Sequence, residues 1–561
     1  MTPPATAPSP SDRAVEGTHP RSPGRISHVR AEDRSGDEVI LDARLLPAAV
    51  CCWLATLLAI GAGWQAGVAV AVGAVVMAFG PWGLWWTAVT HRSERKRVVT
   101  LVLLGAVLSG AAFAAVGAWR EYRVSEHPLR SVPATASVRV AVTVADDPKP
   151  VRTEVPGAER LWIVRANLRE YRYGAERIRV GGAVVILATG KQWSALLPGQ
   201  PIEFRARPSP PRRHDLTVAG LRPLGPPKTI GPLPWWQRLA ASVRADLVDA
   251  AARALPPESA GLLPALVVGD TSALSDEVRD EFVASGLQHL CVVSGANFTI
   301  VLTVVLFLTR LLTFGPYLSA ACAAAALVLF VVIARPDPSV LRAAAMGSVT
   351  LLALVTGRRK QALPALCAAV IALLAIWPGL AVQAGFALSV LATGALILLA
   401  PGWVDRLRDH GWWRLPAELV AVAAAAFVVT APILVALTGR LGLVAVAANI
   451  LAAPVVAPIT VVGAVGAVTA SIWMPFAELI LHCAAPPLWW LLAVADRAAA
   501  IPGATVPVPG GAAGGLVTAG IVTVGIWALH SAGVRRLMTA AATGVAAVVI
   551  PLLVASHTLP R

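Results

Sequence analysis

Charged residues are scarce in this chain. Only 14% of its 561 residues are Asp, Glu, Lys or Arg, and 56% are hydrophobic, whereas an ordinary soluble domain carries roughly 25% charged residues. Cysteine is rare too: all six cysteines lie in apolar segments and none belongs to a CxxC pair. The composition argues against an ordinary soluble domain, and the cysteine spacing excludes a zinc or dithiol motif.

Motifs of common enzyme classes are missing as well. The sequence contains no Gly-x-Ser-x-Gly element and no Walker phosphate-binding loop, which excludes the usual serine hydrolase and ATPase arrangements. No acid is placed to orient His289 toward Ser294 as in a catalytic triad. We therefore expect a channel or transporter and not an enzyme, with no catalytic residue, no cofactor and no metal site.

Long apolar runs are abundant instead. Runs of about 20 residues, enough to cross a hydrocarbon core of about 30 Å, recur from Leu45 to Ser556. Residues 1–42 are rich in Pro, Ser and Arg and are typical of a disordered tail without a cleavable signal peptide. Three spans follow within residues 43–119, and their basic loop His91–Arg97 predicts a cytoplasmic N-terminus.

Residues 120–231 are polar and alternate like a small β domain. Val138, Val140, Val142 and Val144 point one way, and five short strands separated by turns suit an exterior barrel of the oligonucleotide-binding (OB) type. The segment holds 19 Lys or Arg against 10 Asp or Glu, a net charge of +9. Such a domain either holds a polyanion or is simply well solvated.

The rest of the chain returns to the membrane. Residues 232–286 include the amphipathic stretch Trp235–Leu255, which fits a membrane interface or packing on the β domain. Residues 287–557 contain ten further apolar runs, so we expect a polytopic α-helical membrane protein with about 12–13 transmembrane helices. Its basic loops at 357–360, 406–414 and 535–536 all fall inside under this count, which puts the C-terminus outside.

Two places interrupt the apolar pattern. Asn449, Pro454 and Pro458 lie at membrane depth, which favours a broken or re-entrant helix because irregular backbone there needs protein or water around it. Arg342 lies inside an apolar run. A charged residue at such a position either serves the transported substrate, pairs with a nearby acid, or reaches out to the membrane surface.

The most specific stretch is residues 284–299, in which Gly-Leu-Gln-His-Leu leads into Ser294-Gly295 and then Asn297. It resembles the signature of the ComEC family of bacterial DNA-uptake proteins. Later blocks resemble that family in order, from Val340-Leu-Arg-Ala with Gly357-Arg358 through Gly-Phe-Ala-Leu-Ser389 to Asn449–Pro454. The resemblance covers about residues 256–532, and the leading spans and exterior β insert match more loosely.

Two departures from the family pattern stand out. Asn297 replaces the usual histidine after the Ser-Gly pair, which puts in doubt any role that needs an imidazole. Many members also carry a C-terminal metallo-β-lactamase-like domain with a His-x-His pair, and none of the ten histidines here forms one. We therefore expect this chain to lack that domain.

The resemblance implies a multi-pass channel in the bacterial inner membrane that imports single-stranded DNA during natural transformation. Expected partners are single-stranded DNA and membrane lipids, with an exported DNA receptor, a separate nuclease, a cytoplasmic ATPase or a second copy of the chain as further candidates. A small-solute or ion transporter, or a membrane assembly protein, on the same fold is the alternative. The implied pore residues are His289, Ser294, Gly295, Asn297, Arg342, Gln383 and Asn449, and the implied DNA contacts are Arg165, Arg169, Arg205 and Arg207. Trp162 and Tyr171 are candidates for stacking on bases.

Overall fold

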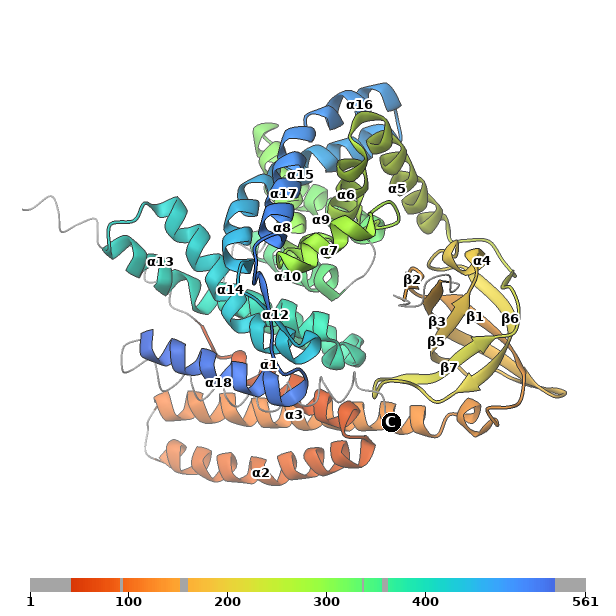
Figure 1. Cartoon of the computed structure of the whole chain (residues 1–561). Coiled ribbons are helices and arrows are strands. Elements are labelled where there is room, and N and C mark those ends of the chain that lie inside the picture. Colours follow the sequence, from red (N-terminus) through yellow and green to blue (C-terminus); the bar gives the residue numbers. More distant parts are fainter. Residues whose placement is uncertain (1–41, 91–93, 152–159, 335–337, 356–361, 530–561) are drawn as a thin grey trace, which may run out of the picture. The chain divides into compact units, whose positions relative to one another are not determined.

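The computed structural model describes residues 42–90, 94–151, 160–334, 338–355 and 362–529. The chain begins with helices α1 (Leu46–Gly61), α2 (Trp64–Thr90) and α3 (Glu94–Ser125), of which α2 and α3 lie side by side (Figure 1). Small residues allow this close approach: a Cβ added to Gly67 would lie 2.7 Å from the Cβ of Ala59 and 2.8 Å from that of Ala118. Such small-residue contacts are typical of helix packing in membranes.

The β domain follows a short turn, η2 (Pro128–Ser131). Its strands are β1 (Val138–Val144), β2 (Lys149–Pro150), β3 (Leu161–Tyr173), β4 (Glu176–Ile178), β5 (Gly182–Thr189), β6 (Pro201–Ser209), β7 (Thr217–Pro223) and β8 (Lys228–Thr229), with a turn of helix, α4 (Lys191–Ser194), after β5. The strand order is β1-β3-β5-β7-β6-β8, and β1 also pairs with β6. Because β5 and β7 run parallel and the other pairs antiparallel, the sheet is mixed.

The alternation predicted for the first strand is confirmed. Val138, Val140, Val142 and Val144 are all buried in the core of the β domain, together with Trp193 and Phe204, whose rings meet edge to face. A strand buries every second residue when one of its faces covers a core. The apolar positions of β1 therefore set which face of the sheet is inside.

A bulge in β3 changes the alternation there. Val142 of β1 lies opposite Leu168, but the preceding Ala141 lies opposite Glu170, so Arg169 is the extra residue. The bulge shifts the inward positions by one, and Tyr171 becomes fully buried while Arg172 and Tyr173 are exposed. The prediction that Tyr171 stacks on bases was wrong for this reason.

A helical core forms around α5 (Trp235–Ala254) and α6 (Pro257–Val268). The apolar face of α5, with Val243, Leu247 and Ala251, packs against α6, α15 (Ala445–Ala470) and α16 (Met474–His482). Trp235 and Trp236 at its start are exposed, and the placement of this helix at the membrane interface stays a prediction. The alternative packing of α5 along the β domain gives way to these helical contacts.

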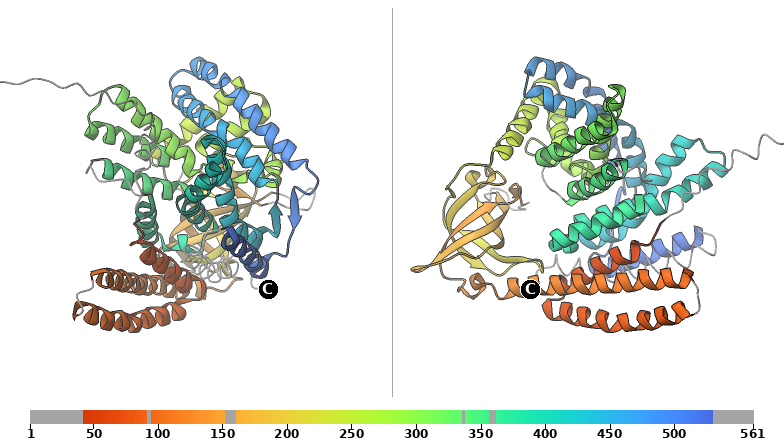
Figure 2. Two further views of the ribbon diagram at one scale, coloured as in Figure 1. Left: turned by 90° about the vertical axis from the view of Figure 1, so that its left-hand side faces the viewer. Right: turned by 180° about the vertical axis from the view of Figure 1, so that it is seen from behind.

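The remaining helices complete the bundle seen from two further sides in Figure 2. They are α7 (Asp276–Ala284), η3 (Gln288–Leu290), α8 (Gly295–Leu311), α9 (Pro316–Ala334), α10 (Pro338–Val355), α11 (Ala362–Ile376), η4 (Pro378–Val382), α12 (Ala384–Leu398), α13 (Ala400–Asp409), α14 (Arg414–Thr438), α17 (Ala485–Ala499) and α18 (Gly511–Leu529), with the strands β9 (Arg440–Gly442) and β10 (Thr505–Pro507) paired between them. Trp53 of α1 donates its indole N–H to the Ala381 carbonyl and packs on Phe386. The N-terminal helices are thereby tied to η4 and α12.

Membrane spans are the dominant feature of this bundle. Within the described residues, five helices are long and apolar enough to cross a membrane, or six if the bent pair α16 and α17 counts as one span. Seven further apolar helical stretches of 10–17 residues were found among the described side chains, and some of them belong to longer helices such as α2. The prediction of a multi-pass helical membrane protein is confirmed. The expected number of 12–13 helices refers to the whole chain, including the apolar run at residues 538–556 outside the described residues, and stays a prediction. The basic loops at 357–360 and 535–536 lie outside the described residues.

The helix expected to break near Asn449 does not break. α15 is continuous from Ala445 to Ala470 with Pro454 and Pro458 inside it. Trp490 of α17 donates its indole N–H to the carbonyl of Leu451, three residues before Pro454, and so joins α17 to this part of α15. The sharp bend, 52°, comes afterwards between α16 and α17.

Candidate functional site

The signature segment forms the start of α8. Ser294 is the N-cap: its Oγ accepts from the Asn297 backbone N–H at 3.3 Å and donates to Asn297 Oδ1 at 3.2 Å. Asn297 is only 1% exposed, and its Nδ2 donates to the Leu266 carbonyl of α6 at 2.8 Å. Asn297 therefore joins α8 to α6 by a buried hydrogen bond, a task that an amide performs without an imidazole.

Arg342 of α10 is a buried cation next to this segment. It is 8% exposed, its Nε donates to Ser389 Oγ at 2.7 Å, and its Nη1 donates to Thr393 Oγ1 at 2.6 Å. A Cβ added to Gly295 would lie 2.8 Å from the Arg342 Nη2, so the guanidinium rests on the first residue of α8. Both hydroxyl partners are neutral, and no ion pair joins Arg342 to a carboxylate among the described residues.

This contact brings three of the predicted residues together: Arg342, Gly295 and, through the N-cap, Ser294. The sequence analysis missed Ser389 and Thr393, the residues of α12 that hold the guanidinium. Their spacing was the available signal, because residues four apart share one face of a helix. The structure adds α12 to the site as the helix that orients Arg342.

The same helix begins at a cavity of about 400 Å³. Gln383, Ala384 and Gly385 line it together with Arg165 and other residues of the β domain. The polar residues from the β domain are Asp146, Lys149, Arg165, Asn167, Arg213, Asp215 and Thr217. Two predicted residues from separate regions, Gln383 and Arg165, thus face one cavity where the β domain meets the helices.

The cavity carries more positive than negative side chains. The Nη1 of Arg165 lies 3.7 Å from Asp146 Oδ2, and the Arg213 side chain is exposed at the cavity. Desolvation, and then the nearby charge of Arg165, lower the pKa of the Arg213 guanidinium from its usual value, and Asp215 acts in the opposite direction. Crowding of two guanidinium groups in one cavity costs electrostatic energy that an incoming anion would relieve.

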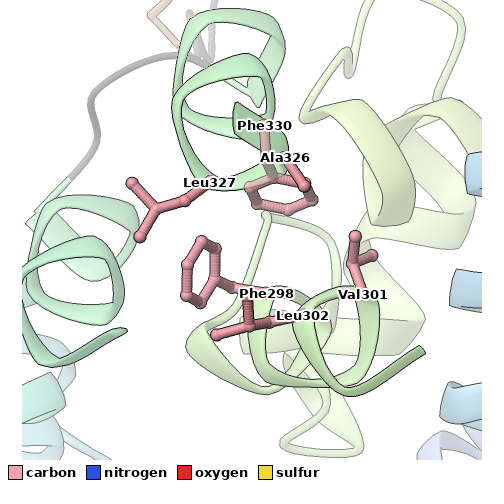
Figure 3. A pocket seen from close by; sticks show the side chains of 6 residues that line it. All are labelled: Phe298, Val301, Leu302, Ala326, Leu327 and Phe330. Atoms are coloured by element: carbon pink, nitrogen blue, oxygen red, sulfur yellow. The ribbon is translucent and has the colours of Figure 1, made fainter. Parts of the chain in front are cut away.

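A second pocket is of the opposite character. Figure 3 shows Phe298, Val301 and Leu302 of α8 facing Ala326, Leu327 and Phe330 of α9. Every lining side chain is apolar, and the rings of Phe298 and Phe330 meet edge to face with centroids 5.6 Å apart. The seam between α8 and α9 is therefore a packing interface and not a polar path.

The other two predicted pore residues lie elsewhere. His289 is exposed in η3, and Asn449 donates its Nδ2 to the Ala445 carbonyl in the preceding turn of its own helix at 2.7 Å. No hydrogen bond among the described residues links either of them to Arg342. Gly286, whose φ is 76°, packs against Ala445. The signature segment and α15 are therefore in contact close in sequence to His289 and Asn449.

The predicted DNA contacts on the β domain occupy separate places. Arg165 faces the cavity, Arg169 is the exposed bulge residue, and Arg205 and Arg207 are exposed on β6. The sheet places further arginines beside the last two: Arg205 lies opposite Arg139, and Arg207 lies opposite Arg222. Arg139 in turn lies opposite Arg172. Strand pairing, which the sequence does not display, creates these neighbours.

Comparison with known proteins agrees with the signature. Residues 266–532 match the family model described as Competence protein. The chain is also similar to ComE operon protein 3 of Bacillus subtilis (strain 168), with 32% identity over 157 residues, which is 28% of this chain and 20% of the relative. The match thus spans about a fifth of the relative's length. No solved structure matches the chain.

Proposed function

We propose that the chain is an inner-membrane channel for the uptake of single-stranded DNA, because residues 266–532 match the competence protein family model. In this proposal residues 1–42 are a cytoplasmic tail, residues 120–231 form an exterior domain that receives the strand, and residues 287–557 form the channel. Residues 43–119 anchor it, and residues 232–286 lie at the membrane interface. The C-terminus is exterior.

The β domain suits this role as an OB-like barrel. Five of its strands, β1, β3, β5, β7 and β6, each pair with two neighbours, because β1 joins both β3 and β6. A five-stranded Greek-key barrel is the architecture that often binds oligonucleotides. Its net charge of +9 supports an anionic ligand.

The observation that carries the proposal is the connection along α12. The helix starts at the cationic cavity with Gln383 and, six residues later, holds the Arg342 guanidinium through Ser389. Six residues of helix cover about 9 Å. A strand that enters at Arg165 and Arg213 would therefore meet a second cation about one to two nucleotides further along the same helix.

Arg342 has the chemistry to meet a phosphate. Its Nη2 rests on the first residue of α8, where the helix dipole adds further positive potential. A buried cation beside the positive end of a helix is unfavourable by itself. An anionic phosphate would compensate the charge of the guanidinium and that of the helix end together. Guanidinium binds phosphate through two parallel hydrogen bonds. His289, Asn297 and Asn449 are then supporting residues of the channel wall.

Several partners belong to the proposal. An exported receptor would deliver DNA to the β domain, a separate nuclease would remove the second strand, and a cytoplasmic ATPase would pull the imported strand.

The second candidate function is a small-anion transporter. The cavity favours it because a volume of about 400 Å³ also suits a small solute.

The test is import in a strain that lacks the gene. Fluorescently labelled double-stranded DNA should still bind the surface of the deletion strain but should stay sensitive to added nuclease, and the wild-type chain should restore protection. Uptake of radiolabelled phosphate is measured in the same cells. Normal DNA import without the gene contradicts the proposal, and a loss of phosphate uptake alone favours the second candidate.

A further inference from the structure

Three arginines form a row across adjacent strands of the β domain. In the sheet register Arg172 of β3 lies opposite Arg139 of β1, and Arg139 lies opposite Arg205 of β6. All three side chains are exposed. Directly opposite residues in a sheet have Cβ atoms about 4.5–5.5 Å apart, so the row places like charges side by side.

The row continues to β7. Arg207 lies two residues after Arg205, on the same face of β6, and pairs in register with Arg222. The cationic row therefore comprises Arg172, Arg139, Arg205, Arg207 and Arg222. It crosses four strands instead of following one.

Nearby carboxylates neutralise the row only in part. The Oε1 of Glu203 lies 3.9 Å from the Nε of Arg139. Glu170 accepts a hydrogen bond from Arg177 Nε at 2.8 Å, and this bond is the main reason why the pKa of the Glu170 carboxyl is lowered, with a smaller contribution from the charge of Arg172. Opposed like charges destabilise a sheet, and an anion bound along the row would relieve the repulsion that Glu170 and Glu203 leave uncompensated.

The row is separate from the cavity. Arg165, which faces the cavity, precedes Arg172 by seven residues on β3, and seven residues of strand extend over roughly 20 Å. The β domain thus presents cationic groups at two ends of one long strand. A ligand that reaches both must be an extended polyanion.

We infer that the cationic row is an outer docking surface for the sugar–phosphate backbone of single-stranded DNA, which rests on the proposed function. The row captures the strand first, and the cavity receives its leading end. Since the row consists of guanidinium groups, it contacts phosphates and carries no base preference. A strand long enough to span both places binds more tightly than a short one, because the second contact is intramolecular.

The experiment uses the full-length protein in nanodiscs of zwitterionic lipid. Fluorescence anisotropy measures the affinity for labelled 20-nucleotide and 5-nucleotide oligo-dT and for a mixed-sequence 20-mer, over a series of salt concentrations. The row variant is Arg139→Gln/Arg172→Gln/Arg205→Gln, which removes a like-charge repulsion and should fold. The control is Arg160→Gln/Arg179→Gln/Arg253→Gln, three exposed arginines that each pair with a carboxylate.

The row variant should bind the 20-mers at least about tenfold more weakly, and the slope of log affinity against log salt should fall by about 2, since each single-strand phosphate contact contributes about 0.7. The control should stay within about twofold of wild type. An unchanged row variant overturns the inference.

A cavity variant, Arg165→Gln/Arg213→Gln, separates the two proposals. If it weakens binding and the row variant does not, the channel proposal stands and the outer surface falls; if wild type binds no DNA, both fall. Flotation with vesicles containing anionic lipid gives the last outcome. Loss of vesicle association by the row variant with unchanged DNA binding assigns the row to lipid headgroups and refutes the inference.

Discussion

Replacing Arg342 with methionine removes the guanidinium charge but keeps a long side chain in its place. The substitution deletes hydrogen bonds at 2.7 Å to Ser389 and at 2.6 Å to Thr393. A hydrogen bond to a charged group contributes about 1.5–3 kcal/mol to stability. Burial of the charge costs several kcal/mol without a carboxylate partner, so the two terms nearly cancel and folding stability should change by only about 1 kcal/mol.

DNA import should respond quite differently. If the guanidinium binds a phosphate in transit, its loss removes one charged contact of about 1.5–3 kcal/mol, which corresponds to a fall in uptake of roughly tenfold to hundredfold. Arg342→Lys should restore uptake in part, because an ammonium keeps the charge but lacks the planar fork. The assay measures membrane abundance by immunoblot and nuclease-protected labelled DNA in the same cells.

A purely structural role leads to the reverse pattern. Arg342→Lys would then be tolerated and Arg342→Ala would lower abundance, with uptake following abundance in every variant. Wild-type import by Arg342→Met at normal abundance would refute the phosphate contact. It would also remove α12 from the proposed path.

Three further predictions follow from the same geometry. Gly295→Ala should displace the Arg342 guanidinium and reduce import at normal abundance, whereas Gly394→Ala, which meets no atom within 4 Å, should not; equal import by both variants contradicts the contact. Asn297→Ala should lower abundance in the membrane, because it leaves a buried carbonyl unpaired at a cost of about 1–3 kcal/mol, and normal abundance would argue against the bond to α6. A reporter active only in the cytoplasm should be silent when fused at Gly174 and active after Lys360, and activity at Gly174 would reverse the orientation.

Much of the fold class could be read from local patterns. The apolar runs and the scarcity of charge predicted a multi-pass helical membrane protein, and the valines of β1 predicted their buried face. Both patterns repeat over a few residues, so they are visible without any knowledge of the neighbours. The signature at residues 284–299 likewise pointed to the family that the comparison with residues 266–532 supports.

The candidate site could be predicted from the sequence only in part. Arg342 was recognisable because a charge in an apolar run is costly, but its partners Ser389 and Thr393 lie 47 and 51 residues away along the chain. The prolines of α15 predicted a break, but the helix is continuous and packs against α17. One inserted residue at Arg169 reversed the orientation expected for Tyr171.

By itself the sequence determined the membrane class, the family signature and the positions of the unusual charges, because hydrophobic period and composition are local properties. Only the tertiary structure decided which charges meet. It placed Arg165 and Gln383 on one cavity, set Arg342 on Gly295, and aligned Arg172, Arg139 and Arg205 across three strands. Strand register and helix packing join residues far apart in the chain, and no local pattern encodes those distances.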